Sequence, residues 1–198
     1  MSHGDEYRYI RDHMKPGQFS LTITGEGKIG ELRSILSFIK KVHKHVGWTK
    51  AQIEHEYLFY SCTSLASMIF ELYQGKNKNV DCVEICTPYE RLDEEYCSHF
   101  ALRVNNTKPM KYIDISGIQK EAEIKSKMVK RWVAILEKEK GTYGDLPKTY
   151  EGLFAKTGVE VRNNYGCGRS SLLSYIRDNI QVVPKKKLSN PNAGNPAL

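Results

Sequence analysis

The sequence predicts an α+β fold in which amphipathic helices cover an antiparallel sheet. Two long segments, Ile29 to Val46 and Glu121 to Lys140, carry apolar residues at the 3.6-residue spacing of a helix. Three shorter segments are typical of strands separated by turn residues, namely 80–86, 98–104 and 110–116. We therefore expect a three- or four-stranded antiparallel core with helices packed against it.

Each of the two long helices shows one apolar face. In the first helix, that face consists of Leu32, Ile35, Leu36, Ile39 and Val42. Lysine residues near its end and Gly47 after it suit a helix C-terminus, because cations interact favourably with the helix dipole there. In the second helix, the apolar face consists of Ile124, Met128, Trp132, Ile135 and Leu136. The opposite face of this helix is rich in Lys and Glu, as expected of a solvated side.

Shorter elements connect these segments. Residues 18–24 alternate in polarity and favour an edge strand. Thr49 is a candidate N-cap for a short helix that runs through Tyr57. Residues 169–180 follow Gly168 and favour a last helix.

The chain of 198 residues is long enough for one domain with its own core. We expect a flexible or helical N-terminal arm at 1–17, a single catalytic domain at 18–183 and a disordered basic tail at 184–198. No apolar run is long enough to span a bilayer, and the first residues lack the apolar core of a signal peptide. These features predict a cytoplasmic location where the protein is made, and secretion by a route without a cleaved signal stays open.

Charge and cysteine content limit the partners and the redox state. The formal net charge of +7 favours acidic partners, including nucleic acid or an anionic surface. The simpler explanation of this charge is a solvated lysine-rich surface without such a partner. An odd number of cysteines, five, without a signal peptide favours reduced thiols over a disulfide framework.

The segment from Tyr60 to Tyr73 predicts a buried helix that begins at or next to Cys62. A cysteine in that place lies over backbone N–H groups that have no helical partner, at the positive end of the helix dipole. That setting lowers the pKa of a thiol and favours the nucleophilic thiolate.

Two further residues, His99 and Asp114, lie on neighbouring predicted strands. The turn chemistry of residues 105–109 favours a hairpin between these strands. A hairpin centred between Asn106 and Thr107 places His99 directly opposite Asp114 on one face. The carboxylate would then hold the imidazole so that its other nitrogen faces a nucleophile.

The order and spacing of Cys62, His99 and Asp114 resemble the papain-like superfamily, and most closely its transglutaminase-like branch. The resemblance covers about residues 58–117. It implies a cysteine-bearing helix packed on an antiparallel sheet, with histidine and aspartate on two successive strands and without cofactor or metal. In this arrangement Cys62 attacks an amide carbonyl, His99 transfers the proton and Asp114 orients His99.

The resemblance also implies an oxyanion site. The backbone N–H of Cys62 would be one donor, and the second should come from just upstream of the cysteine helix. Gln52, Tyr57 and Tyr60 are the candidates.

The function implied is acyl transfer or hydrolysis at an amide of a protein substrate. Protease, glutamine deamidase and transglutaminase chemistry all fit, and an acidic substrate is one option because of the positive net charge. One hypothesis from the resemblance is a secreted effector or toxin that modifies host proteins. The sequence leaves the oligomeric state open.

Five alternatives compete with the enzyme hypothesis. Cys62 taken alone suits a buried small residue, and the same fold could serve as a non-catalytic module that binds protein or nucleic acid. Zinc could use Cys82, Cys86, Cys97 and His99, but residues four apart on a strand lie about 13 Å apart, too far for one ion. Nucleic-acid binding rests on charge and on residues 185–187 alone. Residues 166–171 suggest a phosphate loop but lack the leading Gly and the Lys of that motif.

Overall fold

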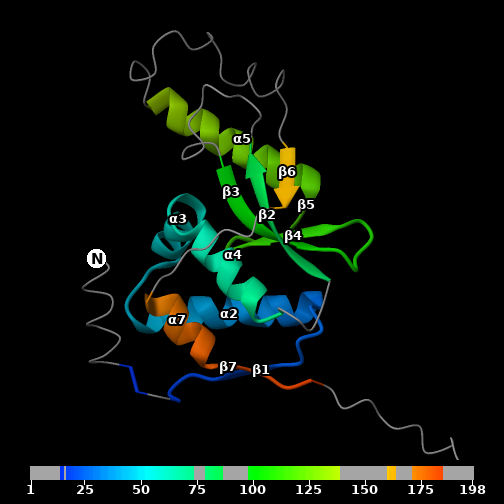
Figure 1. The fold of residues 1–198 in the computed structure, drawn as a ribbon. Helices are drawn as coiled ribbons and strands as arrows, with labels where there is room; N and C mark the ends of the chain where they lie inside the picture. The colour runs from blue at the N-terminus through cyan, green and yellow to red at the C-terminus, as the bar shows by residue number, and fades with distance from the viewer. Residues whose placement is uncertain are drawn as a thin grey trace, which may run out of the picture.

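The computed structural model of the chain describes residues 14–15, 17–73, 79–86, 98–138, 160–163 and 171–184. Its helices are α2 (Ile29–His45), α3 (Lys50–Phe59), α4 (Cys62–Glu71), α5 (Glu121–Lys138) and α7 (Ser171–Asp178). Its strands are β1 (Leu21–Ile23), β2 (Val80–Cys86), β3 (Ser98–Val104), β4 (Lys111–Asp114), β5 (Gly117–Lys120), β6 (Glu160–Asn163) and β7 (Ile180–Val182). The fold is therefore of mixed helix and sheet content, in agreement with the α+β expectation (Figure 1).

The main sheet has five strands in the order β5-β4-β3-β2-β6, all antiparallel to their neighbours. The expectation of three or four strands was wrong, because β5 and β6 were not predicted. Gly117 begins β5 with a φ of +127°, a conformation that residues with a Cβ rarely adopt, and this lets the chain fold back directly onto β4. A second, two-stranded sheet pairs β1 with β7 in parallel.

Helices cover the two faces of the main sheet. Leu102 and Ile113 pair across β3 and β4 and belong to the core that contains Leu65 and Ile69 of α4. Because side chains alternate along a strand, Tyr112 points to the other face, where its hydroxyl donates to Glu121 of α5 at 3.0 Å. Helix α2 lies beside α4 in Figure 1 and completes the first core layer.

The apolar face predicted for α2 is buried as expected, including Ile35, Ile39 and Val42 at 0% exposure. Met14 also belongs to this core, although it lies in the segment predicted as an arm. The rest of that arm, residues 1–13 and 16, and the basic tail from 185 onward lie outside the described residues. The same holds for residues 164–170, which contain most of the candidate phosphate loop.

Short-range signals set the start of α3. Thr49 accepts a hydrogen bond from the backbone N–H of Gln52, and the Gln52 carboxamide oxygen accepts one from the backbone N–H of Thr49. This reciprocal pair is a capping box, and it agrees with the predicted N-cap.

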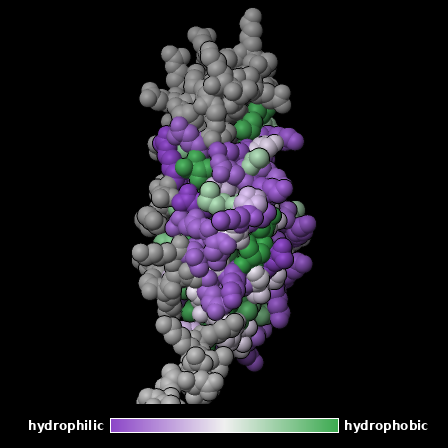
Figure 2. Space-filling model, turned by 90° about the vertical axis from the view of Figure 1, so that its right-hand side faces the viewer, coloured by the Kyte–Doolittle hydropathy of each residue, from purple (hydrophilic) through white to green (hydrophobic). Residues whose placement is uncertain are grey.

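The surface drawn in Figure 2 is mostly hydrophilic, with separate apolar patches among polar side chains. Scattered apolar surface of this kind is ordinary for a folded domain. Within the described ranges, none of the helices has the length and apolar character needed to cross a membrane.

Candidate functional site

Cys62 is the first residue of α4 and is partly buried. The N-cap residue, Ser61, does not cap the helix with its side chain. Its hydroxyl instead donates to the Glu56 carboxylate at 2.5 Å. The N–H of Leu65 donates to the carbonyl oxygen of Ser61 at 3.0 Å, which is the first backbone hydrogen bond of the helix. The Ser61 side chain supplies no acceptor for the N–H groups of the first turn.

His99 of β3 and Asp114 of β4 meet in the interior of the protein. The His99 Nε2 atom lies 3.3 Å from the Asp114 Oδ2 atom, and the two side chains are 0% and 1% exposed. This distance is longer than that of a typical charge-assisted hydrogen bond, and the Asp114 carboxylate still favours the charged form of the imidazole. Nε2 faces the carboxylate, and Nδ1, the other ring nitrogen, has no hydrogen-bond partner among the described residues.

The predicted direct pairing of His99 with Asp114 was wrong. In the structure, Leu102 pairs with Ile113 and Val104 with Lys111, which places Ala101 opposite Asp114 when this register is extended. The reason is the loop: β4 begins at Lys111, so the connection is longer than the turn centred between residues 106 and 107. A shift of two residues keeps every side chain on its face, and His99 and Asp114 therefore remain diagonal neighbours that can touch.

The second carboxylate oxygen of Asp114 is held by the chain that follows it. Its Oδ1 atom accepts the backbone N–H of Ser116 at 2.7 Å and the Nε2–H of Gln119 at 3.1 Å. Burial acts to raise the pKa of Asp114, but the adjacent His99 imidazole and the Ser116 N–H outweigh it, and the pKa lies below its ordinary value. Gln119 was missed in the sequence because it belongs to β5, which was not predicted.

Cys62 and His99 stabilise each other's charged forms, and this shifts both of their pKa values. In Cys62, burial acts to raise the pKa, but the His99 imidazole at the sulfur stabilises the thiolate, and the pKa is lower than that of a free thiol. The backbone of Phe100 and the side chain of Thr63 add to this effect. In His99, burial acts to lower the pKa, but Asp114 and Cys62 favour the imidazolium, and the pKa is raised. Both shifts favour a thiolate–imidazolium pair.

Cys82 provides an internal comparison. It is fully buried on β2, and burial together with the negative charge of Cys62 raises its pKa to about 12. Cys62 and Cys82 are thus two thiols in one domain with pKa values shifted in opposite directions, and the neighbouring imidazole distinguishes Cys62.

The three candidates for a second oxyanion donor have other contacts. Gln52 uses its carboxamide oxygen to cap the first turn of α3. The Tyr57 hydroxyl lies 2.7 Å from the Nε2 atom of buried His43. Tyr60 is 72% exposed, and its ring lies against His55 with a centroid distance of 5.4 Å. Of the three, Tyr60 comes nearest to Cys62 along the chain, at the end of α3.

A cation on α5 accompanies the site. Arg131 is partly buried, and burial lowers its pKa to about 10. The negative charges of Cys62 and Asp114 act in the opposite direction and favour its charged form. The sequence pattern did not single out Arg131, because it stands among other charged residues on a helix that was assigned a solvated face rich in Lys and Glu.

The zinc alternative uses four residues, and one of them, Cys97, lies outside the described residues. Cys82 and Cys86 lie on β2, both buried. In the part of the chain that the structure describes, no group of three or more His, Cys, Asp or Glu side chains is arranged to hold a metal ion.

The described residues therefore bring a thiol, an imidazole and a carboxylate from α4, β3 and β4 into one cluster. Such a cluster can form a thiolate, pass the thiol proton to the imidazole and stabilise the resulting imidazolium. Comparisons with protein-family models, with curated proteins and with solved structures find no match to this chain.

Proposed function

We propose that this protein is a thiol enzyme of the papain-like type, closest to its transglutaminase-like branch, that acts on an amide of a protein substrate. The observation that carries the proposal is the buried contact of His99 with Asp114, next to a cysteine whose thiolate that histidine stabilises. Hydrolysis of a peptide bond, deamidation of glutamine and transfer to an amine all begin with the same chemical step.

In that step the Cys62 thiolate attacks the carbonyl carbon of the amide, and a sulfur–carbon bond forms. The tetrahedral intermediate collapses, its carbon–nitrogen bond breaks, and the leaving amine or ammonia takes the proton that His99 carries. The thioester is then attacked by water or by an amine, whose proton returns to His99. The thiolate is released, so no oxidant or reductant is needed.

The oxyanion of the tetrahedral intermediate needs hydrogen-bond donors. The backbone N–H groups of the first turn of α4 are suited to this role, because the side chain of Ser61 bonds to Glu56 and does not cap them. A single donor of this kind contributes about 3 kcal/mol to transition-state stabilisation.

The test is the pH dependence of alkylation by iodoacetamide, with mapping of each modified cysteine by mass spectrometry. We expect Cys62 to react well below the pH at which a free thiol of pKa about 8.5 reacts. Cys82 and Cys86 should react slowly at the same pH, because both are buried and burial raises the pKa of Cys82. Equal, slow labelling of all three would contradict the proposal.

Asp114→Asn separates the triad from a merely buried cysteine. It removes the charge that supports the His99 imidazolium but keeps the shape of the side chain, so the pKa of Cys62 should rise. The alkylation rate of Cys62 at pH 6 should therefore fall by at least about threefold. Asp81→Asn is the matched control, since Asp81 lies in the same sheet but pairs with Arg103 at 2.8 Å. Melting temperatures establish that both variants fold, and an unchanged Cys62 profile in folded Asp114→Asn would exclude the triad.

A further inference from the structure

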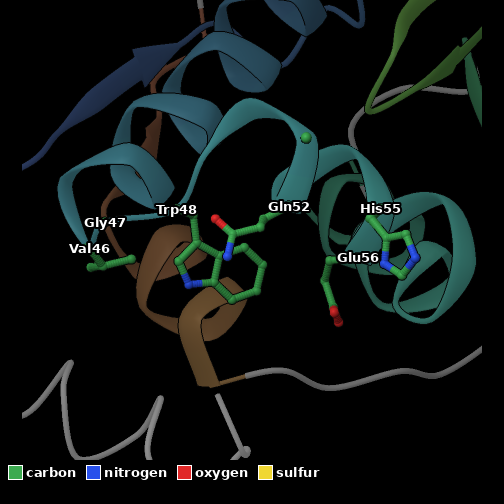
Figure 3. A pocket seen from close by; sticks show the side chains of 7 residues that line it. Val46, Gly47, Trp48, Gln52, His55 and Glu56 are labelled. Atoms are coloured by element: carbon green, nitrogen blue, oxygen red, sulfur yellow. The ribbon is translucent and has the colours of Figure 1, made fainter.

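A groove runs along the outer face of α3, next to the segment that connects α2 to α3. It has a volume of about 550 Å³, and its lining includes Trp48, Ala51, Gln52, His55 and Glu56. The helical spacing of Ala51, Gln52, His55 and Glu56 places them on one side of α3. Figure 3 shows Trp48 and Glu56 extending to the same side, with the Gln52 carboxamide next to the indole.

One residue of the groove contacts the segment that precedes the candidate nucleophile. The Glu56 carboxylate lines the groove and also accepts the hydroxyl of Ser61, the residue directly before Cys62. The His55 imidazole, another lining residue, lies against Tyr60. A chain that occupies the groove would therefore lie close to Ser61, the residue that precedes Cys62.

The charge in the groove differs from that of the molecule. The chain has a net charge of +7, yet Glu56 is the only formally charged residue among the described residues that line the groove. Many other acidic side chains make ion pairs, such as Asp81 with Arg103 and Glu54 with Lys50. The Glu56 carboxylate accepts a hydrogen bond from the Ser61 hydroxyl. Within the described ranges it has no cationic partner closer than 4.0 Å.

We propose that this groove binds an extended segment of the protein substrate that carries a lysine or arginine, with the cation beside Glu56. The indole of Trp48 offers an aromatic face to the same segment. The lining from Ala51 to Glu56 follows about 8 Å of α3 at the helical rise of about 1.5 Å per residue, a length that two or three extended residues cover. The identity of the occupant as a substrate rests on the proposed thiol chemistry.

Binding can be measured without that chemistry. The full chain carrying Cys62→Ala is titrated with fluorescently labelled tetrapeptides Ala-Ala-Xaa-Ala, in which Xaa is lysine, norleucine or glutamic acid, and anisotropy gives the Kd. We expect the lysine peptide to bind at least threefold more tightly than the norleucine peptide and more tightly still than the glutamic acid peptide. Added salt should reduce this preference, since it depends on charge.

Two glutamine variants of the same background locate the effect. Glu56→Gln keeps an acceptor for Ser61 but removes the charge, and it should abolish the lysine preference. Glu54→Gln removes one charge from the same helix, where Glu54 pairs with Lys50, and should change the preference less than twofold. Equal binding of the lysine and norleucine peptides, undetectable binding of all three, or equal losses in both variants would overturn the proposal.

The outcome is distinguishable from that of the proposed function. Alkylation of Cys62 in the otherwise unchanged chain reports the thiol chemistry, and the peptide titration reports the groove. An acidic thiol without a lysine preference refutes the groove alone. A lysine preference with an unreactive Cys62 keeps the cation site and refutes the enzyme, so the occupant would no longer be a substrate.

Discussion

His43 and His99 are both fully buried, and their surroundings shift their pKa values in opposite directions. His99 faces the carboxylate of Asp114, which favours the imidazolium. Among the described residues, His43 has neutral hydrogen-bond partners, the Ile39 carbonyl oxygen at 2.8 Å and the Tyr57 hydroxyl at 2.7 Å, so burial lowers its pKa to about 4. Burial alone thus does not decide the charge of a histidine, and the neighbouring group does.

The titration of His43 should appear in the stability of the protein. Its pKa is about 4 in the folded state and about 6.5 unfolded, so its contribution is fully present above pH 6.5 and is lost as the pH falls toward 4. Between pH 7 and pH 5 we expect the free energy of unfolding to fall by about 2 kcal/mol from this group. Urea unfolding at the two pH values measures the change.

A double variant assigns that change to His43. His43→Leu with Tyr57→Phe removes both members of the hydrogen bond, so neither is left buried without its partner. Its unfolding free energy should vary less between pH 7 and pH 5. His45→Gln, an exposed residue on the same helix, is the control and should behave like the unchanged protein. An unchanged pH slope in the double variant would refute this assignment.

At the scale of single elements, the β4–β5 hairpin supports the site. Gln119 on β5 donates to Asp114 Oδ1, while Asp114 contacts His99 through Oδ2. Gln119 therefore acts as a positioning residue, which fixes the carboxylate that faces the imidazole. A purely structural residue would affect stability without changing the acidity of the thiol.

Gln119→Ala should leave Asp114 with one hydrogen bond fewer and raise the pKa of that carboxyl group. The imidazolium then loses support, so the midpoint of Cys62 alkylation should move to higher pH and the rate at pH 6 should fall about two- to fivefold. Lys120→Ala, an exposed position on the same strand, provides the comparison. A loss of melting temperature with no shift of the alkylation profile would indicate a structural role only.

At the scale of the whole molecule, the acidity of Cys62 is a property of the tertiary structure. The groups around its sulfur come from α4 and β3, and the carboxylate that supports His99 comes from β4. Unfolding separates all of them and returns each thiol to a pKa of about 8.5.

In 6 M guanidinium chloride at pH 6, we expect Cys62 to lose its advantage and to react at the same rate as Cys82 and Cys86. The two buried thiols should instead react faster than in the folded protein, because unfolding exposes them. Time-resolved alkylation with mass mapping measures each rate. If Cys62 stayed faster than the others after unfolding, local sequence rather than the fold would cause its reactivity.

Much of the architecture follows from local patterns. The strands at 80–86 and 98–104 and the helix from Ile29 agree with their predicted bounds to within a residue, because periodicity and turn residues are properties of short segments. The choice of face is local too. Alternation along a strand places Leu102 and Ile113 in the core, and it keeps His99 and Asp114 on one side even though the predicted register was wrong by two residues.

What the sequence by itself determined is thus the type and extent of the long elements, the start of α4 near Cys62 and the faces of the strands. Only the tertiary structure decided the pairing of β5 and β6, the offset between β3 and β4, and the contacts of Gln119 and Tyr57. The physical reason is that a four-residue strand carries too few positions for a periodic signal. Its pairing depends on loop length and on burial among residues far apart in the chain, which no short stretch of sequence encodes.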